Sequence, residues 1–161
     1  MAASITTEKK NSLGVTGFDH TRICVSDLER SKEFYEEFLD MKIDRIPERQ
    51  VSDELDLILG GTGVGVSLLF GRIAGHIVEL IHLDHVHVEV APTHPHIGNG
   101  GFTLTVRDID AAFKAAQLAG ILATPAIVEV HGTKIFFVND PDGNRIECIQ
   151  YVDGHAVSWP E

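Results

Sequence analysis

The chain has 161 residues, a length typical of one domain of about 100–200 residues. Its 43% hydrophobic and 23% charged residues are ordinary for a globular protein and exclude a disordered or fibrous chain. The 13 Lys and Arg residues against 24 Asp and Glu residues give a net charge of −11. Such a surface repels phosphate backbones, so no nucleic acid is expected as a partner. No apolar run approaches the roughly 18 residues of a membrane span, so no membrane is expected either.

The two ends of the chain and its cysteines indicate where the protein acts. Residues 1–15 contain no apolar core and no cleavage pattern, which argues against a secretory signal. We expect them to form a flexible tail, and residues 153–161 to form a second tail after a single domain over 16–152. Cys24 and Cys148 lie in apolar, strand-like runs and are predicted to be buried free thiols in a reducing compartment. These features favour a cytoplasmic location.

The first half of the domain alternates strand and helix patterns. The predicted strands cover 18–25, 41–47, 64–70 and 77–83, with a helix over 28–39 and a short helical turn over 53–59. Ser26 followed by Glu29 predicts a capping box at the start of the longer helix. Ala74-Gly75 predicts the turn between the last two strands.

The second half follows the same order. The predicted strands cover 102–106, 127–130, 135–138 and 145–151. Asp108 is expected to cap a helix that runs to about Ala119, with Gly120 just past its end. The run Asp140-Pro141-Asp142-Gly143 is typical of a turn.

An internal repeat relates the two halves. HTRICVSDLE at 20–29 aligns with GFTLTVRDID at 101–110, and IVELI at 77–81 aligns with RIECI at 145–149. Each copy therefore reads βαβββ. We predict an α+β fold of two such units, over 16–83 and 100–152, joined by a linking strand over 84–99. Equivalent residues of the two units would face one central cleft.

Three polar residues occupy matched places in this repeat. His20 lies on the first predicted strand, and Glu79 and Glu147 lie on the last strand of each unit. A carboxylate in an apolar strand is costly to bury unless it is paired or binds a metal. An imidazole with two carboxylates suits a divalent ion. The sequence thus predicts a shared metal site; the plainer alternative is three separate polar residues that face solvent or internal partners.

These motifs resemble the vicinal oxygen chelate superfamily, which holds glyoxalase I, methylmalonyl-CoA epimerase, extradiol dioxygenases, fosfomycin-resistance enzymes and bleomycin-resistance proteins. The matching residues run from His20-Thr21 through Asp27-Leu28 to Phe34-Tyr35, and from Gly132-Thr133 through Asp140–Asn144 to Glu147. The resemblance covers about residues 16–152. It implies a glyoxalase-like sheet domain, a small-molecule substrate or ligand and a homodimer.

The resemblance also implies four metal ligands, one on the first and one on the last strand of each unit. Three of them carry over as His20, Glu79 and Glu147, and the fourth position falls on Gly101, which offers no ligand atom. Three outcomes are open: a three-ligand metal with more water, a replacement ligand such as His94 or His96, or a cleft without metal. Gly101 also weighs against an extradiol dioxygenase, which needs two histidines.

The resemblance implies a metal-dependent lyase or isomerase of the glyoxalase type, so we expect an enzyme. Its substrate would carry two adjacent oxygens, both chelated by the metal, which would stabilise an enediolate-like charge. His20 would be a ligand, and either Glu79 or Glu147 would act as general base. The ion would be Zn, Ni, Mn, Co or Fe. The alternative is a metal-free binding protein of the bleomycin-resistance kind that sequesters a small molecule.

Arg22 and a cluster of histidines each allow two interpretations. Arg22 shares a strand face with His20, where it would bind a substrate carboxylate or phosphate, or else pair with a cleft glutamate. The segment 82–96 contains five histidines, and within it His85, His87 and Glu89 would share one strand face. This cluster would bind zinc independently or form the polar side of an exposed linking strand.

Overall fold

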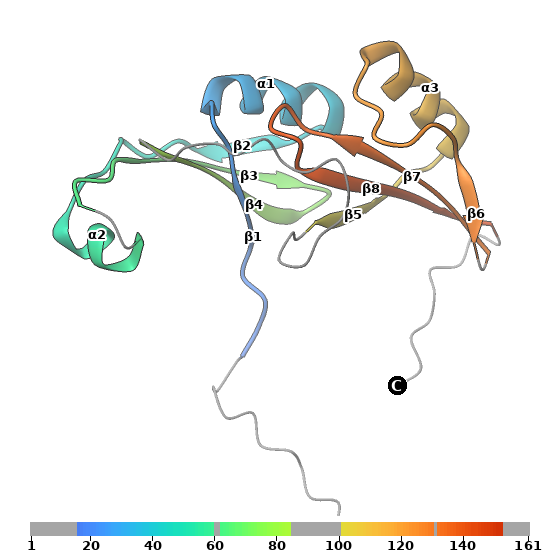
Figure 1. Cartoon of the computed structure of the whole chain (residues 1–161). Coiled ribbons are helices and arrows are strands. Elements are labelled where there is room, and N and C mark those ends of the chain that lie inside the picture. Colours follow the sequence, from blue (N-terminus) through green and yellow to red (C-terminus); the bar gives the residue numbers. More distant parts are fainter. Residues whose placement is uncertain (1–15, 60–61, 85–100, 131, 153–161) are drawn as a thin grey trace, which may run out of the picture.

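The computed structural model describes residues 16–59, 62–84, 101–130 and 132–152, which form two four-stranded sheets with helices packed against them (Figure 1). The first sheet has the strand order β1-β4-β3-β2. Its strands are β1 (Thr21–Cys24), β2 (Lys42–Arg45), β3 (Val66–Ile73) and β4 (His76–Leu83). The second sheet has the order β5-β8-β7-β6. Its strands are β5 (Phe102–Thr105), β6 (Val128–Val130), β7 (Thr133–Asn139) and β8 (Arg145–Tyr151).

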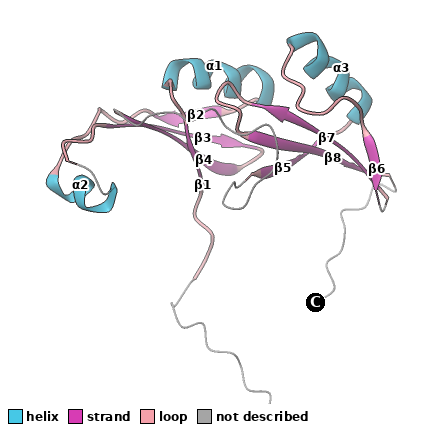
Figure 2. Cartoon of the chain, viewed as in Figure 1, coloured by secondary structure: helices cyan, strands magenta, loops and turns pink. Residues whose placement is uncertain are grey.

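The predicted repeat is confirmed by the topology. Each unit has its first strand parallel to its last strand, β1 to β4 and β5 to β8, and its other pairs antiparallel. Helices α1 (Leu28–Leu39) and α3 (Ile109–Ala119) follow the first strand of each unit. Both helices lie on the same side of the sheets, whereas the short α2 (Asp53–Leu59) lies apart from them (Figure 2). The α+β class of paired βαβββ units is therefore confirmed.

The core lies between the helices and the sheet faces that they cover. Ile23, Leu69 and Leu80 are buried in one apolar cluster with Phe34 and Tyr35 of α1. Because side chains alternate along a strand, the residues between these positions point to the opposite face. Every second residue of β1, β3 and β4 therefore lines an open face away from the helices. This alternation places the polar residues of interest together.

The start of α1 differs from the expected capping box. Asp27, not Ser26, is the N-cap residue, and its carboxylate accepts the backbone N–H of Arg30 at 3.0 Å. Ser26 bonds instead to Asp142 of the second unit, through both its backbone N–H and its hydroxyl. The capping role went to the neighbouring carboxylate because Ser26 has a tertiary partner. In the second unit Asp108 caps α3 as predicted.

Residues of the turn Asp140–Gly143 also form hydrogen bonds that join the two units. Asp140 is buried and accepts the Tyr35 hydroxyl of α1 at 3.0 Å, while Asp142 accepts Arg30 at 2.7 Å. The Asn144 side chain donates to the Cys24 carbonyl at 3.2 Å. We call these contacts the inter-unit bonds. They fix the second unit against α1 and the end of β1, a role that the sequence did not predict.

Several smaller expectations were tested by the structure. Cys148 is buried as predicted. Cys24, in contrast, is exposed, because it lies on the open face of β1. The first strand begins at Thr21, so His20 directly precedes it instead of lying on it. No helix within the described ranges is long and apolar enough to cross a membrane. The tails, and the linking segment from His85 through His94 and His96, lie outside the described residues.

Candidate metal and substrate site

The first half of the site is a contact between His20 and Glu79. His20 Nε2 lies 3.3 Å from Glu79 Oε2, and His20 Nδ1 lies 2.5 Å from Asp19 Oδ1. The hydrogen bond to Asp19 is the main cause that raises the pKa of His20; burial opposes the rise, and the charge of Glu79 adds to it less strongly. If Nδ1 donates its proton to Asp19, neutral His20 faces Glu79 with a lone pair, and two acceptors cannot share that distance favourably. A proton on Nε2, or a metal ion bound by both atoms, would relieve this repulsion.

This geometry fits a metal ligand pair. A metal-binding histidine commonly donates its other ring N–H to a carboxylate, which fixes the ring orientation. Asp19 is positioned to accept this N–H from His20 Nδ1. Glu79 is among the few buried charged residues of the described chain, so its carboxylate gains from a cationic partner. His20 and Glu79 therefore fit two ligands of a divalent ion.

The second half of the site is built around Glu147. Its Oε2 accepts the Thr103 hydroxyl at 2.7 Å. Thr103 pairs with Glu147 across β5 and β8 in the same register in which Arg22 pairs with Glu79 across β1 and β4. Thr103 thus orients a predicted site residue.

The structure brings His20 and Glu79 together but does not add Glu147 to them. In the described part of the chain, no group of three or more His, Cys, Asp or Glu residues could hold one metal ion. Both glutamates nevertheless lie on the faces turned away from the core, because their strand neighbours Leu80 and Cys148 belong to it. The two halves are thus built separately on the two units.

Gly101 lies just before β5, as His20 lies just before β1. A Cβ atom added to it would be 3.0 Å from the backbone oxygen of Arg145 and would meet no other atom of the described residues within 4 Å. No described residue therefore fills the space that a side chain would need. Only one backbone contact is tight, and a shift of a few tenths of an ångström would relieve it.

Arg22 is exposed next to this site. Its register partner is Glu79, yet the two side chains form no ion pair, and no other described carboxylate pairs with Arg22. Of its two predicted roles, pairing with a cleft glutamate is therefore absent within the described residues. Binding of an anionic substrate group stays a prediction.

The aromatic residues divide between core and open face. Phe136 is buried beneath α3, and Phe102 packs against the same core. Phe137, in contrast, is only half-buried and lies opposite Glu147 across β7 and β8. Its counterpart Phe70 pairs with Glu79 across β3 and β4 and meets His20 edge to face, with ring centroids 6.2 Å apart. The sequence missed both as neighbours of the site.

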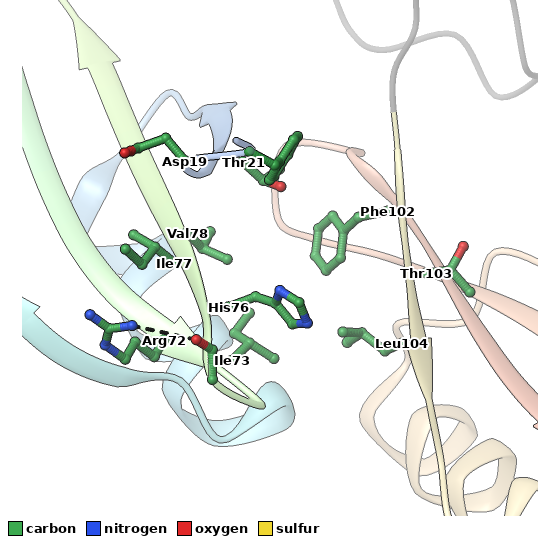
Figure 3. Close-up of a pocket in the computed structure, with 12 residues that line it drawn as sticks. Asp19, Thr21, Arg72, Ile73, His76, Ile77, Val78, Phe102, Thr103 and Leu104 are labelled. Atoms are coloured by element: carbon green, nitrogen blue, oxygen red, sulfur yellow. Dashed lines mark hydrogen bonds between the residues drawn. The ribbon is translucent and has the colours of Figure 1, made fainter. Parts of the chain in front are cut away.

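A groove of about 410 Å³ lies between the two units (Figure 3). Asp19, Thr21, Arg72 and His76 line it from the first unit, and Phe102 and Thr103 line it from the second. It contains neither His20 nor the two glutamates. It borders their partners instead, since Asp19 bonds to His20 and Thr103 bonds to Glu147.

Known proteins share this sequence pattern and this fold. Residues 17–148 match the family model described as the Glyoxalase/Bleomycin resistance protein/Dioxygenase superfamily. The chain is 34% identical over 140 residues to the "Probable lactoylglutathione lyase" of Vibrio cholerae, covering 85% of this chain and 92% of that protein. It is 30% identical over 141 residues to the "Lactoylglutathione lyase" of Neisseria meningitidis serogroup B, covering 84% and 91%.

Solved structures agree at the level of the fold. A glyoxalase family protein from Bacillus cereus superposes with a TM-score of 0.72 at 17% identity, covering 89% of this chain and 99% of that one. The fosfomycin resistance protein FosX from Listeria monocytogenes superposes with a TM-score of 0.59 at 14% identity, covering 88% and 99%. The chain therefore belongs to the glyoxalase, bleomycin resistance protein and dioxygenase superfamily.

Proposed function

We propose that the chain is a metal-dependent lyase or isomerase of the glyoxalase type, acting on a small molecule with two adjacent oxygens. The observation that carries the proposal is the 3.3 Å approach of His20 Nε2 to Glu79 Oε2, with Asp19 behind the imidazole. His20, Glu79 and Glu147 would hold a divalent ion: Zn, Ni, Mn, Co or Fe. When bound, the ion would stabilise negative charge that develops on the substrate oxygens.

The relatives named lactoylglutathione lyases support this substrate class. Lactoylglutathione carries a thioester carbonyl next to a hydroxyl, and a proton must leave the carbon beside a carbonyl for such a compound to isomerise. A carboxylate can take that proton. We assign this base to Glu147, because its partner is the neutral Thr103 hydroxyl, whereas Glu79 Oε2 lies 3.3 Å from His20 Nε2. Arg22 would bind an acidic group of the substrate.

We further propose that the protein acts as a homodimer in which Glu147 of a second copy faces His20 and Glu79. The inter-unit bonds from Asp140, Asp142 and Asn144 hold the two units of one chain in place. Folding one sheet over the other within a chain would break these bonds. A symmetric partner, in contrast, supplies the second half without breaking any of them. The cytoplasmic location expected from the cysteines stays a prediction.

The first experiment measures metal. Protein purified without added metal, and then loaded with each candidate ion in turn, should bind about one equivalent per chain. His20→Ala should lower that content sharply while the circular dichroism spectrum is unchanged. Metal content that is equal in the wild type and in His20→Ala would overturn the metal site.

The second experiment mixes two inactive variants, His20→Ala and Glu147→Gln. If the halves come from different copies, each mixed dimer regains one intact site, so an equal mixture should reach about a quarter of wild-type turnover by the statistics of symmetric pairing. The assay follows the interconversion of lactoylglutathione with methylglyoxal and glutathione. No recovery after subunit exchange, in variants shown to be dimers, would place both halves in one chain.

The alternative function is metal-free binding of a small molecule, of the bleomycin-resistance kind. It is favoured by Gly101, which leaves the fourth ligand position without a donor. It predicts no stoichiometric metal for any of the ions, and no turnover. The metal measurement therefore discriminates the two functions directly.

A further inference from the structure

A row of four side chains crosses the open face of the first sheet. In the strand register Arg22 lies opposite Glu79, Glu79 lies opposite Phe70, and Phe70 lies opposite Arg45. The row therefore passes through β1, β4, β3 and β2. The row has an arginine at each end and a predicted site glutamate inside it. The site is thus flanked by positive charge on both sides, although the chain as a whole is acidic.

A backbone irregularity aims Arg45 at this face. The register of β2 against β3 shifts between Ile43 and Arg45, as it does at a β-bulge. Without the shift, Arg45 would share a face with Ile43, which packs against the core. With it, the Arg45 guanidinium carbon lies 4.4 Å from the centroid of the Phe70 ring. Bulges commonly redirect a side chain next to a functional site.

The second unit builds the same pair by another route. Arg145 lies on β8, two residues before Glu147, and its guanidinium carbon lies 4.4 Å from the centroid of the Phe137 ring. The repeat does not explain this, because one arginine comes from β2 and the other from β8. Arg145 Nε is also buried with no hydrogen-bond partner among the described residues. A buried N–H group without a hydrogen-bond acceptor is energetically costly.

Neither arginine is neutralised by the described protein. Arg30, Arg49 and Arg72 each pair with an aspartate. Arg45 and Arg145, in contrast, form no ion pair among the described residues, in a chain with 24 Asp and Glu against 13 Lys and Arg. Each guanidinium carbon lies 4.4 Å from a ring centroid, and among the described residues no hydrogen bond or ion pair engages the guanidinium N–H groups. A planar guanidinium in this posture presents two parallel donors to an anion.

We propose that Arg45 and Arg145 bind an anionic group of the substrate, so that the site takes an acid, a carboxylate or a phosphonate, and not a neutral carbonyl compound. This inference rests on the proposed function for the location of the reacting atoms, next to Glu79 and Glu147. The phenylalanine rings serve as platforms that orient each guanidinium and exclude water beneath it. The positive charge of each arginine attracts the substrate, and the two parallel N–H donors of the guanidinium orient the substrate toward the glutamate.

The test is a binding measurement on metal-stripped protein, which needs no turnover. Lactate, methylphosphonate and the neutral analogue lactamide are titrated separately and followed by amide chemical shifts in NMR. We expect both anions to shift signals around Phe70 and Phe137, and lactamide to shift none. A stronger response to lactate assigns the group as a carboxylate, and a stronger response to methylphosphonate assigns it as a phosphonate.

Two variants separate charge from packing. Arg45→Met and Arg145→Met keep an unbranched stem over the ring and remove the charge, and each should weaken anion binding about tenfold or more. Arg107→Met is the matched control, because Arg107 is exposed and has no described ion pair, but lies in the loop between β5 and α3. It removes the same charge and should leave the affinity within about twofold.

The outcomes distinguish this inference from the proposed function. Anion binding that is lost in Arg45→Met and Arg145→Met but kept in Arg107→Met supports the inference even if no metal binds and no substrate turns over. Equal affinity of the wild type and both site variants, all folded by circular dichroism, would overturn it, even if the enzyme is active. Equal binding of lactamide and lactate would overturn it as well.

Discussion

The hydroxyl of Tyr35 joins the two units, and its removal tests how strongly. Tyr35 is fully buried in α1, and its hydroxyl donates to the Asp140 carboxylate of the second unit at 3.0 Å. A buried hydrogen bond to a charged group contributes about 1.5–3 kcal/mol. Asp140 keeps three other donors, from the backbone N–H groups of Asp142 and Asn144 and from the Asn144 side chain. Tyr35→Phe should therefore lower the free energy of unfolding by about 2 kcal/mol.

The assay is urea unfolding, with thermal melting as a second readout. For a domain of this size, about 2 kcal/mol corresponds to a Tm lower by about 4–8 °C. The chain offers a matched control in Tyr151, its other tyrosine, which is half-buried and whose hydroxyl has no described partner. Tyr151→Phe should change the free energy of unfolding by less than about 0.5 kcal/mol. Equal effects of the two substitutions would refute the reasoning.

The pH dependence of the same variant gives an independent check. Burial raises the pKa of Asp140, and its hydrogen bonds, that from Tyr35 among them, oppose the rise. A carboxyl whose pKa is higher in the folded state contributes most to stability at low pH, and this contribution is lost as the pH rises through the folded pKa. Without the Tyr35 donor the charged form is held less well. The cost of Tyr35→Phe should thus be larger at pH 7 than at pH 4, and a cost that does not change with pH would contradict this account.

Three further predictions concern the site and the cysteines. Glu147→Gln keeps the shape of the side chain and removes its charge and basicity, so metal content or turnover should fall sharply in a protein that still melts like the wild type; unchanged values would leave Glu147 with a structural role alone. Gly101→His should bind Zn²⁺, Ni²⁺ or Mn²⁺ more tightly in calorimetry, at a stability cost of about 1 kcal/mol from the contact with the Arg145 oxygen; equal or weaker affinity for all three ions would show that the glycine serves to leave space. Burial raises the pKa of Cys148 to about 11, so at pH 8 about one thiol in a thousand is ionised there, and iodoacetamide should modify the exposed Cys24 alone in the native protein and both cysteines in urea; rapid native modification of Cys148 would contradict its burial.

The sequence by itself determined the elements and their order. The limits of α1 matched the prediction at both ends, because the apolar spacing of a helix is a local signal, although the cap is Asp27 and not the predicted Ser26. The repeat predicted two βαβββ units, since HTRICV and GFTLTV carry the same alternation and are each followed by an Asp two residues later. It also singled out His20 and Glu79, which the structure brings to 3.3 Å. These conclusions needed only patterns within a few residues or between the two copies.

Only the tertiary structure decided what depends on partners distant in the chain. The inter-unit bond between Tyr35 and Asp140 joins residues 105 positions apart, and no local pattern distinguishes it from an ordinary turn. The placement of Arg45 over Phe70 needed the bulge in β2, because a shift of one residue moves a side chain to the other face of a sheet. The separation of Glu147 from the His20–Glu79 pair was likewise decided by the tertiary structure. The repeat shows that the two halves are equivalent, but the distance between them is set by how the units pack, and that is decided by the buried bonds that hold them.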